Sequence, residues 1–145
     1  MTLTDWILSL HVLSAVALVG GLAGLWAIVL ATRPAEGGPA AAAPLSIARP
    51  LTIVVAAGMV GTLVFGIWLA IDIDAYELWD PWIVAALVLW VVGGGLGDRS
   101  GRAFAEAASA DDARAPWRRG TILHAASSAV ALVVLVLMIW KPGAS

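Results

Sequence analysis

The sequence predicts an all-α fold: a four-helix transmembrane bundle with up-and-down topology and both termini on the outer side of the membrane. Three observations lead to this prediction. Of the 145 residues, 61% are hydrophobic and 12% are charged, whereas soluble domains carry about 25% charged residues. Four segments approach or exceed the ~20 mostly apolar residues that a membrane-spanning helix requires. All arginines lie in the first and third of the three links between these segments.

The same composition excludes several classes of protein. A mean hydropathy of +0.96 is not compatible with a disordered chain or a nucleic-acid-binding protein. The chain contains no cysteine, so a disulfide scaffold and a zinc–thiolate site are also excluded. We therefore expect the lipid bilayer, and not nucleic acid, to be the main partner.

The four predicted spans form one integral membrane domain over residues 1–145. They cover about 6–32, 51–71, 82–97 and 121–140, and none contains Asp, Glu, Lys or Arg. Each is apolar on all sides, as expected for a helix surrounded by lipid and other helices. The first has no basic flank and a longer apolar run than a signal peptide, so we expect it to be retained. The third is the shortest, but Ala, Glu and Arg residues favour its continuation as helix to about Ala108.

The distribution of charged residues predicts the orientation. The first and third links carry all seven arginines: Arg33, Arg49, Arg99, Arg102, Arg114, Arg118 and Arg119. The second link carries only acidic charges: Asp72, Asp74, Glu77 and Asp80. Lys141 is the single basic residue on the other side. Because basic links stay in the cytoplasm, we predict a multi-pass protein of the bacterial inner membrane with both termini outside.

Tryptophan residues support the same boundaries, because indole rings favour the headgroup level. Near the predicted outer boundary lie Trp6, Trp68, Trp79, Trp82 and Trp140. Near the inner boundary lie Trp26 and Trp117. We expect Trp90, in the middle of the third span, to pack between helices.

Small residues recur at four-residue spacing in every predicted span. The pairs are Gly20/Gly24, Ala57/Gly61, Gly93/Gly97 and Ala125/Ala129. Such spacing places small residues on one helix face and lets two backbones approach each other. We interpret these faces first as packing within the chain and second as contacts of a homo-oligomer.

Two histidines, His11 and His124, are the only ionisable side chains within the spans. An ionisable residue inside a membrane is by default a candidate for function. Since Ser14 shares a helix face with His11, the predicted cofactor-binding residues are His11, Ser14 and His124, with His11 first. The alternative, that each histidine only forms hydrogen bonds between helices, stays open.

The predicted depths of the two histidines differ. His11 lies six residues after Asp5, about 9 Å inside the outer boundary. His124 lies five residues after Arg119, about 8 Å inside the inner boundary. In a hydrocarbon core ~30 Å thick, their depths differ by more than ~10 Å, so they cannot share one iron. His11 alone is the predicted iron ligand, with a second ligand not identified.

The remaining residue patterns identify no reaction. The thioethers of Met59 and Met138 could bind a soft metal, but no two methionines are closely spaced, which favours a role in filling packing gaps. Sequence motifs of nucleotide-binding proteins, zinc proteases and serine hydrolases are absent. Whether the protein is an enzyme therefore stays open at this point.

Several segments together resemble a family of small predicted bacterial integral membrane proteins of unknown function. They are WILSLHVLSAVALVGGLAGL, GMVGTLVFGIWLA, the arginine-rich third link and the ending VLMIWKPG. More distantly, the layout and the closing Lys141–Gly143 are similar to the HemJ-type protoporphyrinogen oxidase family, membrane proteins of four or five helices. That resemblance implies haem b as a cofactor and His11 as its ligand. The third link departs from that family, because it lacks an aromatic and lysine-rich run.

Two functions are consistent with these observations. The first is an accessory or scaffold subunit that binds partners through its small-residue faces. The alternative is a haem b- or porphyrin-handling membrane redox protein that uses His11.

Overall fold

The computed structural model describes residues 2–32, 42–72 and 79–141, and over these residues all regular structure is α-helical. The helices are α1 (Leu3–Ala31), α2 (Ala42–Asp72), α3 (Pro81–Ser109) and α4 (Arg114–Trp140). The predicted extension of the third helix is confirmed, because α3 continues past Gly97 to Ser109. The link residues Arg33, Asp74 and Glu77 lie outside the described residues.

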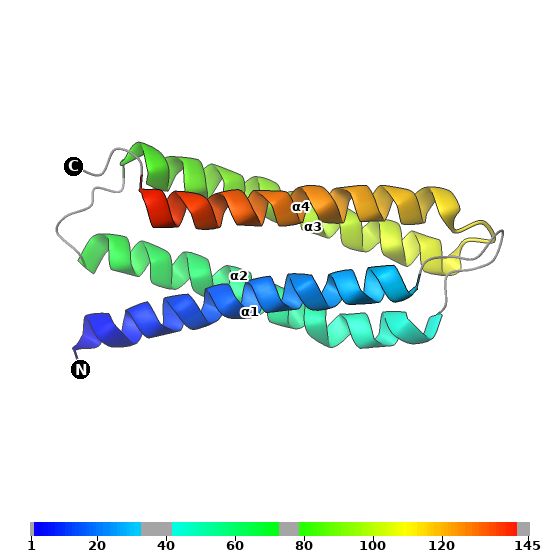
Figure 1. Ribbon diagram of the computed structural model, residues 1–145, viewed down its shortest axis with the longest axis horizontal. Helices are drawn as coiled ribbons and strands as arrows, with labels where there is room; N and C mark the ends of the chain where they lie inside the picture. Colours follow the sequence, from blue (N-terminus) through cyan, green and yellow to red (C-terminus); the bar gives the residue numbers. More distant parts are fainter. Residues whose placement is uncertain (1, 33–41, 73–78, 142–145) are drawn as a thin grey trace.

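The four helices pair into two hairpins, α1 with α2 and α3 with α4 (Figure 1). The start of α1 and the end of α4 lie at the same end of the molecule, so successive helices alternate in direction. The shortest helix, α4, has 27 residues. At 1.5 Å per residue it is about 40 Å long, which exceeds the ~30 Å hydrocarbon core of a bilayer.

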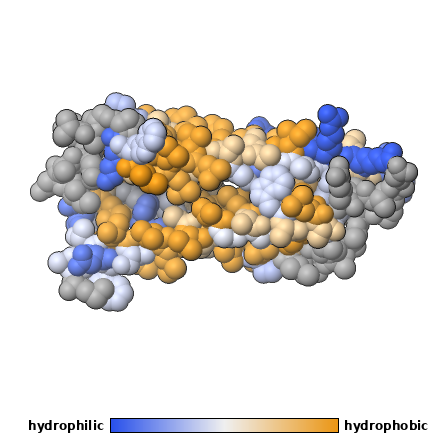
Figure 2. All heavy atoms as spheres, in the orientation of Figure 1, coloured by the Kyte–Doolittle hydropathy of each residue, from blue (hydrophilic) through white to orange (hydrophobic). Residues whose placement is uncertain are grey.

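The outward-facing side chains of the helices are apolar. Large hydrophobic residues such as Leu30, Val91 and Ile139 are between 66% and 75% exposed. Figure 2 shows that hydrophobic residues dominate the middle of the molecule, whereas the strongly hydrophilic residues gather toward its ends. Soluble monomers rarely expose apolar surface on this scale. The length and surface of all four helices are therefore those of membrane spans.

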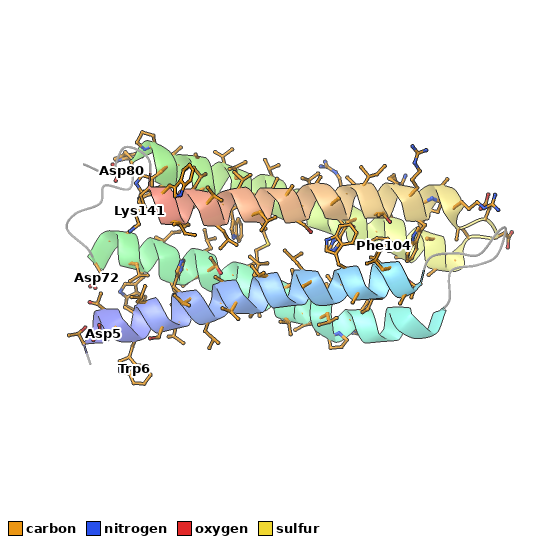
Figure 3. The ribbon with its side chains drawn as sticks, in the orientation of Figure 1. Asp5, Trp6, Asp72, Asp80, Phe104 and Lys141 are labelled. Carbon is orange, nitrogen blue, oxygen red and sulfur yellow. The ribbon has the colours of Figure 1, made fainter. Side chains whose placement is uncertain are left out.

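Charged residues divide the molecule into two ends. Asp5, Asp72 and Asp80 lie with Lys141 at what we call the acidic end (Figure 3). There Thr4 Oγ1 donates a hydrogen bond of 2.6 Å to the Asp72 carboxylate, which ties the start of α1 to the end of α2. The opposite end, which we call the arginine end, carries Arg49, Arg99, Arg102, Arg114, Arg118 and Arg119. Two of these form ion pairs, Arg102 with Asp98 and Arg119 with Glu106.

Close backbone contact holds α1 against α2. A Cβ atom on Gly58 would lie 2.6 Å from the Leu18 nitrogen and 2.7 Å from the Ser14 oxygen. A Cβ atom on Gly21 would lie 2.6 Å from Val55 Cγ2. Glycine is required at these positions because any side chain would push the two helices apart.

The predicted small-residue faces are only partly correct. Gly24 and Gly61 pack against the partner helix within the first hairpin, and Gly93 and Gly97 do so within the second. The other four predicted residues do not: Gly20, Ala57, Ala125 and Ala129 are exposed. In α1 and α2 the buried small residue is the one that follows the predicted residue: Gly21 instead of Gly20, and Gly58 instead of Ala57. The angle at which two helices cross determines which face is buried.

Two groups of buried residues join the hairpins, one at each end. The arginine-end cluster consists of Val29, Ala107, Ala113 and Trp117, with Trp26 and Phe104 packed against it. The acidic-end cluster consists of Ala70, Trp82 and Ile83, with Leu87 and Met138 packed against it. Two predicted boundary tryptophans are thus buried in these clusters, Trp82 at 6% and Trp117 at 7% exposure. In contrast, Trp79 and Trp140 are 85% and 79% exposed.

Candidate functional site

A cavity of about 950 Å³ lies between the two hairpins. Side chains from all four helices line it, and most of them are apolar. We call it the central cavity. A second cavity of about 220 Å³, the acidic-end cavity, is lined in part by the acidic-end cluster. Cofactor sites are concave, mainly apolar and about 300–1,000 Å³ in volume, so the central cavity has the size and character of such a site.

His11 lies on the wall of both cavities. The Nδ1–Cε1 edge of its ring faces Gly66, where a Cβ atom would lie 3.0 Å from Cε1 and 3.3 Å from Nδ1. The backbone of Thr62 lies beside the ring. His11 Nδ1 is buried and has no hydrogen-bond partner among the described residues. The missing side chain of Gly66 therefore makes the space that this imidazole occupies.

Ser14, predicted beside His11, does not lie on the wall of either cavity. Its hydroxyl donates a hydrogen bond of 2.7 Å to the Leu10 carbonyl within α1. The side chain also packs against Gly61 of α2. Two residues that are three apart lie on the same side of a helix but point in somewhat different directions. Here His11 points to the cavity, whereas Ser14 points to α2. The structure thus places Ser14 in the contact between α1 and α2.

His124 lies on the wall of the central cavity, toward the arginine end. It is 4% exposed, and its ring centroid is 4.9 Å from that of Trp26. The Trp26 indole nitrogen donates a hydrogen bond of 3.1 Å to Ser128 Oγ, and Ser128 Oγ donates one of 2.8 Å to the His124 carbonyl. His124 Nε2 is buried with no hydrogen-bond partner among the described residues. His124 therefore belongs to a contact between α1 and α4, which come from different hairpins.

The two histidines are far apart along the bundle. His124 contacts Trp26, which follows His11 by fifteen residues on α1, a rise of about 22 Å. Imidazole nitrogens bind metals at about 2 Å, so the two rings cannot ligate one metal ion. No cluster of three or more His, Asp or Glu side chains that could hold a metal occurs in the described part of the chain.

Three features of the site have no clear signal in the sequence. Gly66 makes room for His11, but it is one of fifteen glycines. The hydrogen bond from Trp26 to Ser128 joins residues that are 102 positions apart. Met138 lines both cavities together with His11. Counting residues from the helix ends places Met138 and His11 toward the same end of the bundle. It does not give the direction of the Met138 side chain.

Comparison with known proteins gives one match. The family model described as "Predicted integral membrane protein (DUF2269)" matches residues 5–142, a range that includes nearly all of the four helices. No curated protein and no solved structure matches the chain. The resemblance to small predicted membrane proteins is thereby confirmed, whereas the more distant HemJ resemblance stays a hypothesis. The chain is a multi-pass integral membrane protein with four transmembrane helices, and it belongs to the DUF2269 family.

Proposed function

We propose that the protein binds haem b, or a related porphyrin, in the central cavity, where the His11 imidazole would ligate the iron. The observation that carries this proposal is the position of His11 on the wall of a largely apolar cavity of cofactor size. An apolar cavity suits the faces of a porphyrin, and histidine is a common axial ligand of haem iron. Bound haem b would supply one-electron redox chemistry.

The surroundings of His11 support this role. Its Nδ1 is buried against Gly66, and the Thr62 backbone lies beside the ring. Histidines that bind a metal through one ring nitrogen direct the other toward a backbone carbonyl or another acceptor. A proton on Nδ1 would leave the lone pair on Nε2, so we expect Nε2 to meet the iron.

The hypothesis of an accessory or scaffold subunit has less support. It requires small-residue faces that are free to meet a partner. Gly24, Gly61, Gly93 and Gly97 are instead used within the two hairpins. The exposed members Gly20, Ala57, Ala125 and Ala129 are the residues that a homo-oligomer would use.

We also propose that the arginine end faces the cytoplasm of a bacterial cell, which places both termini outside the inner membrane. The six arginines of the described residues gather at that end, whereas Lys141 lies at the acidic end. This distribution follows the positive-inside rule. A reporter enzyme that works only outside the cytoplasm, fused after Ser145, should be active. Activity of a cytoplasm-specific reporter at the same position would contradict the orientation.

Absorption spectroscopy tests the haem proposal. The protein is purified in mild detergent from cells supplied with a haem precursor, and we expect a Soret band. His11→Ala should abolish that band. His124→Ala is the matched control, and it should retain the band. It removes a histidine that lines the same cavity but contacts Trp26, which lies about 22 Å from His11 along α1. Size-exclusion chromatography and circular dichroism verify that both variants fold. A colourless wild-type protein, or a Soret band in His11→Ala, would contradict the proposal.

A further inference from the structure

Five residues lie on the walls of both cavities, and they mark the place where the two cavities adjoin. They are His11, Thr62, Trp90, Val134 and Met138. They come from all four helices. A ligand held at His11 would therefore be bordered by this group.

Only two of these five side chains can act as ligands of haem iron. The Thr62 hydroxyl donates a hydrogen bond of 2.7 Å to the Gly58 carbonyl. The Trp90 indole nitrogen has no lone pair to offer and donates a hydrogen bond of 3.2 Å to the Met59 carbonyl. Val134 has no donor atom. The imidazole of His11 and the thioether of Met138 remain, and both are known axial ligands of haem iron.

Residue spacing places Met138 at nearly the depth of His11. Trp26 contacts both His124 and Ser128, which aligns α1 with α4 at that level. Met138 lies ten to fourteen residues beyond these two contacts, about 15–21 Å along α4. His11 lies about 22 Å from Trp26 along α1. Both distances run toward the acidic end, so the levels of the two residues along the bundle differ by about 1–7 Å.

Met59 is the competing thioether, and its position is less suitable. It lines the central cavity but not the acidic-end cavity. It precedes Gly66, which faces the His11 ring, by seven residues, or about 10 Å along α2. Side chains lean toward the start of their own helix, which carries the Met59 sulfur further from His11. Its methyl group also packs against α3, where a Cβ atom on Gly94 would lie 2.6 Å from it.

Met138 is held in place by its neighbours. It is half-buried and packs against the acidic-end cluster of Ala70, Trp82 and Ile83. The sequence alone favours a gap-filling role for this methionine. The structure adds one fact to this: Met138 lies on the walls of both cavities that His11 borders. A residue that only fills a packing gap does not need to lie beside His11.

We infer that Met138 would be the second protein ligand of the haem iron, so that α1 would supply an imidazole and α4 a thioether. This inference rests on the proposed function. The two ligands come from different hairpins, so a bound haem would join the hairpins between the two end clusters. Ligation by one methionine and one histidine also favours a raised reduction potential.

Met138→Leu tests the inference, because leucine keeps the volume and removes the sulfur. The matched control is Met59→Leu, which removes the other thioether of the central cavity. We expect wild-type ferric protein to be low-spin by electron paramagnetic resonance and to show the weak charge-transfer absorption of thioether-bound haem. Met138→Leu should keep its Soret band and haem content through His11 but lose the thioether absorption, become high-spin and have a lower reduction potential. Met59→Leu should keep the thioether absorption and the low-spin state of the haem that it binds.

The outcomes separate this inference from the proposed function. A colourless wild-type protein overturns both. If the Soret band depends on His11 but the spin state and thioether absorption survive in Met138→Leu, only the role of Met138 is wrong. Loss of the thioether absorption in Met59→Leu would also contradict the role of Met138, because it would show that Met59 is the thioether ligand. Met138→His should restore a low-spin spectrum without the thioether absorption, which separates ligation from an effect on packing.

Discussion

The contact within the first hairpin and the contact between the two hairpins are built from different residues. Within the hairpin, Gly21 and Gly58 bring the backbones of α1 and α2 close together. Between the hairpins, side chains meet in the arginine-end and acidic-end clusters and through the hydrogen bonds from Trp90 to Met59 and from Trp26 to Ser128. The central cavity lies beside these contacts. One contact therefore fixes the position of a helix, whereas the other leaves space for a ligand.

The physical basis of this difference is the membrane environment. Lipid tails are as apolar as leucine, so burial of leucine gives little drive for helices to associate. Close van der Waals packing and hydrogen bonds between helices supply the stability instead. Small residues allow such packing, whereas the larger side chains of Leu18, Leu22 and Val134 line the cavity between the hairpins. We expect the three substitutions below to affect the two contacts unequally.

Gly58→Ala should have the largest effect on stability. The added Cβ atom would lie 2.6 Å from a backbone nitrogen of α1, so the helices must separate. We expect a loss of about 1–3 kcal/mol in the free energy of unfolding, as for overpacked cores. Unfolding in mixed detergent micelles measures this loss. Gly20→Ala is the matched control, since no atom lies within 4 Å of its new methyl group. Equal effects of the two substitutions would contradict the description of the contact.

Trp26→Phe should have an intermediate effect, because it weakens a contact between hairpins without disturbing α1 and α2. It removes the hydrogen bond from the indole nitrogen to Ser128 Oγ. Hydrogen bonds between membrane helices contribute about 0.6 kcal/mol on average and up to about 1.7 kcal/mol. A double-mutant cycle with Ser128→Ala measures the coupling. Trp6→Phe, at a residue that is 56% exposed, should change nothing. A cycle with no coupling would show that this bond does not join the hairpins.

Ala131→Leu should have the smallest effect on stability, within about 0.5 kcal/mol, which is typical of substitutions that create neither strain nor a cavity. Its larger side chain enters the central cavity, whose wall includes Ala131. The same variant should bind less haem per protein, measured from the Soret band, because the space is partly filled. Ala129→Leu, on the exposed side of α4, is the control and should retain full haem content. Equal haem content in the two variants would place the ligand elsewhere.

Much of the fold could be predicted from the sequence, because helix length and apolar composition are local properties. Uninterrupted apolar runs indicate the four helices, and the Ala, Glu and Arg residues after Gly97 indicate the extension of α3. The candidate site could be predicted in part. His11 and His124 are conspicuous as the ionisable residues within the spans, and their unequal depth follows from counting residues to the nearest charge.

The tertiary structure alone decided which side of each helix faces a neighbour. A helix that is apolar on all sides carries no periodic signal for its buried face. The sequence therefore could not show that Gly58, and not Ala57, would meet α1, or that Ser14 would face α2 and not the cavity. It also could not bring Met138 to the space beside His11. Those placements depend on the crossing of the helices and on the packing of the two end clusters, which involve residues distant in the chain.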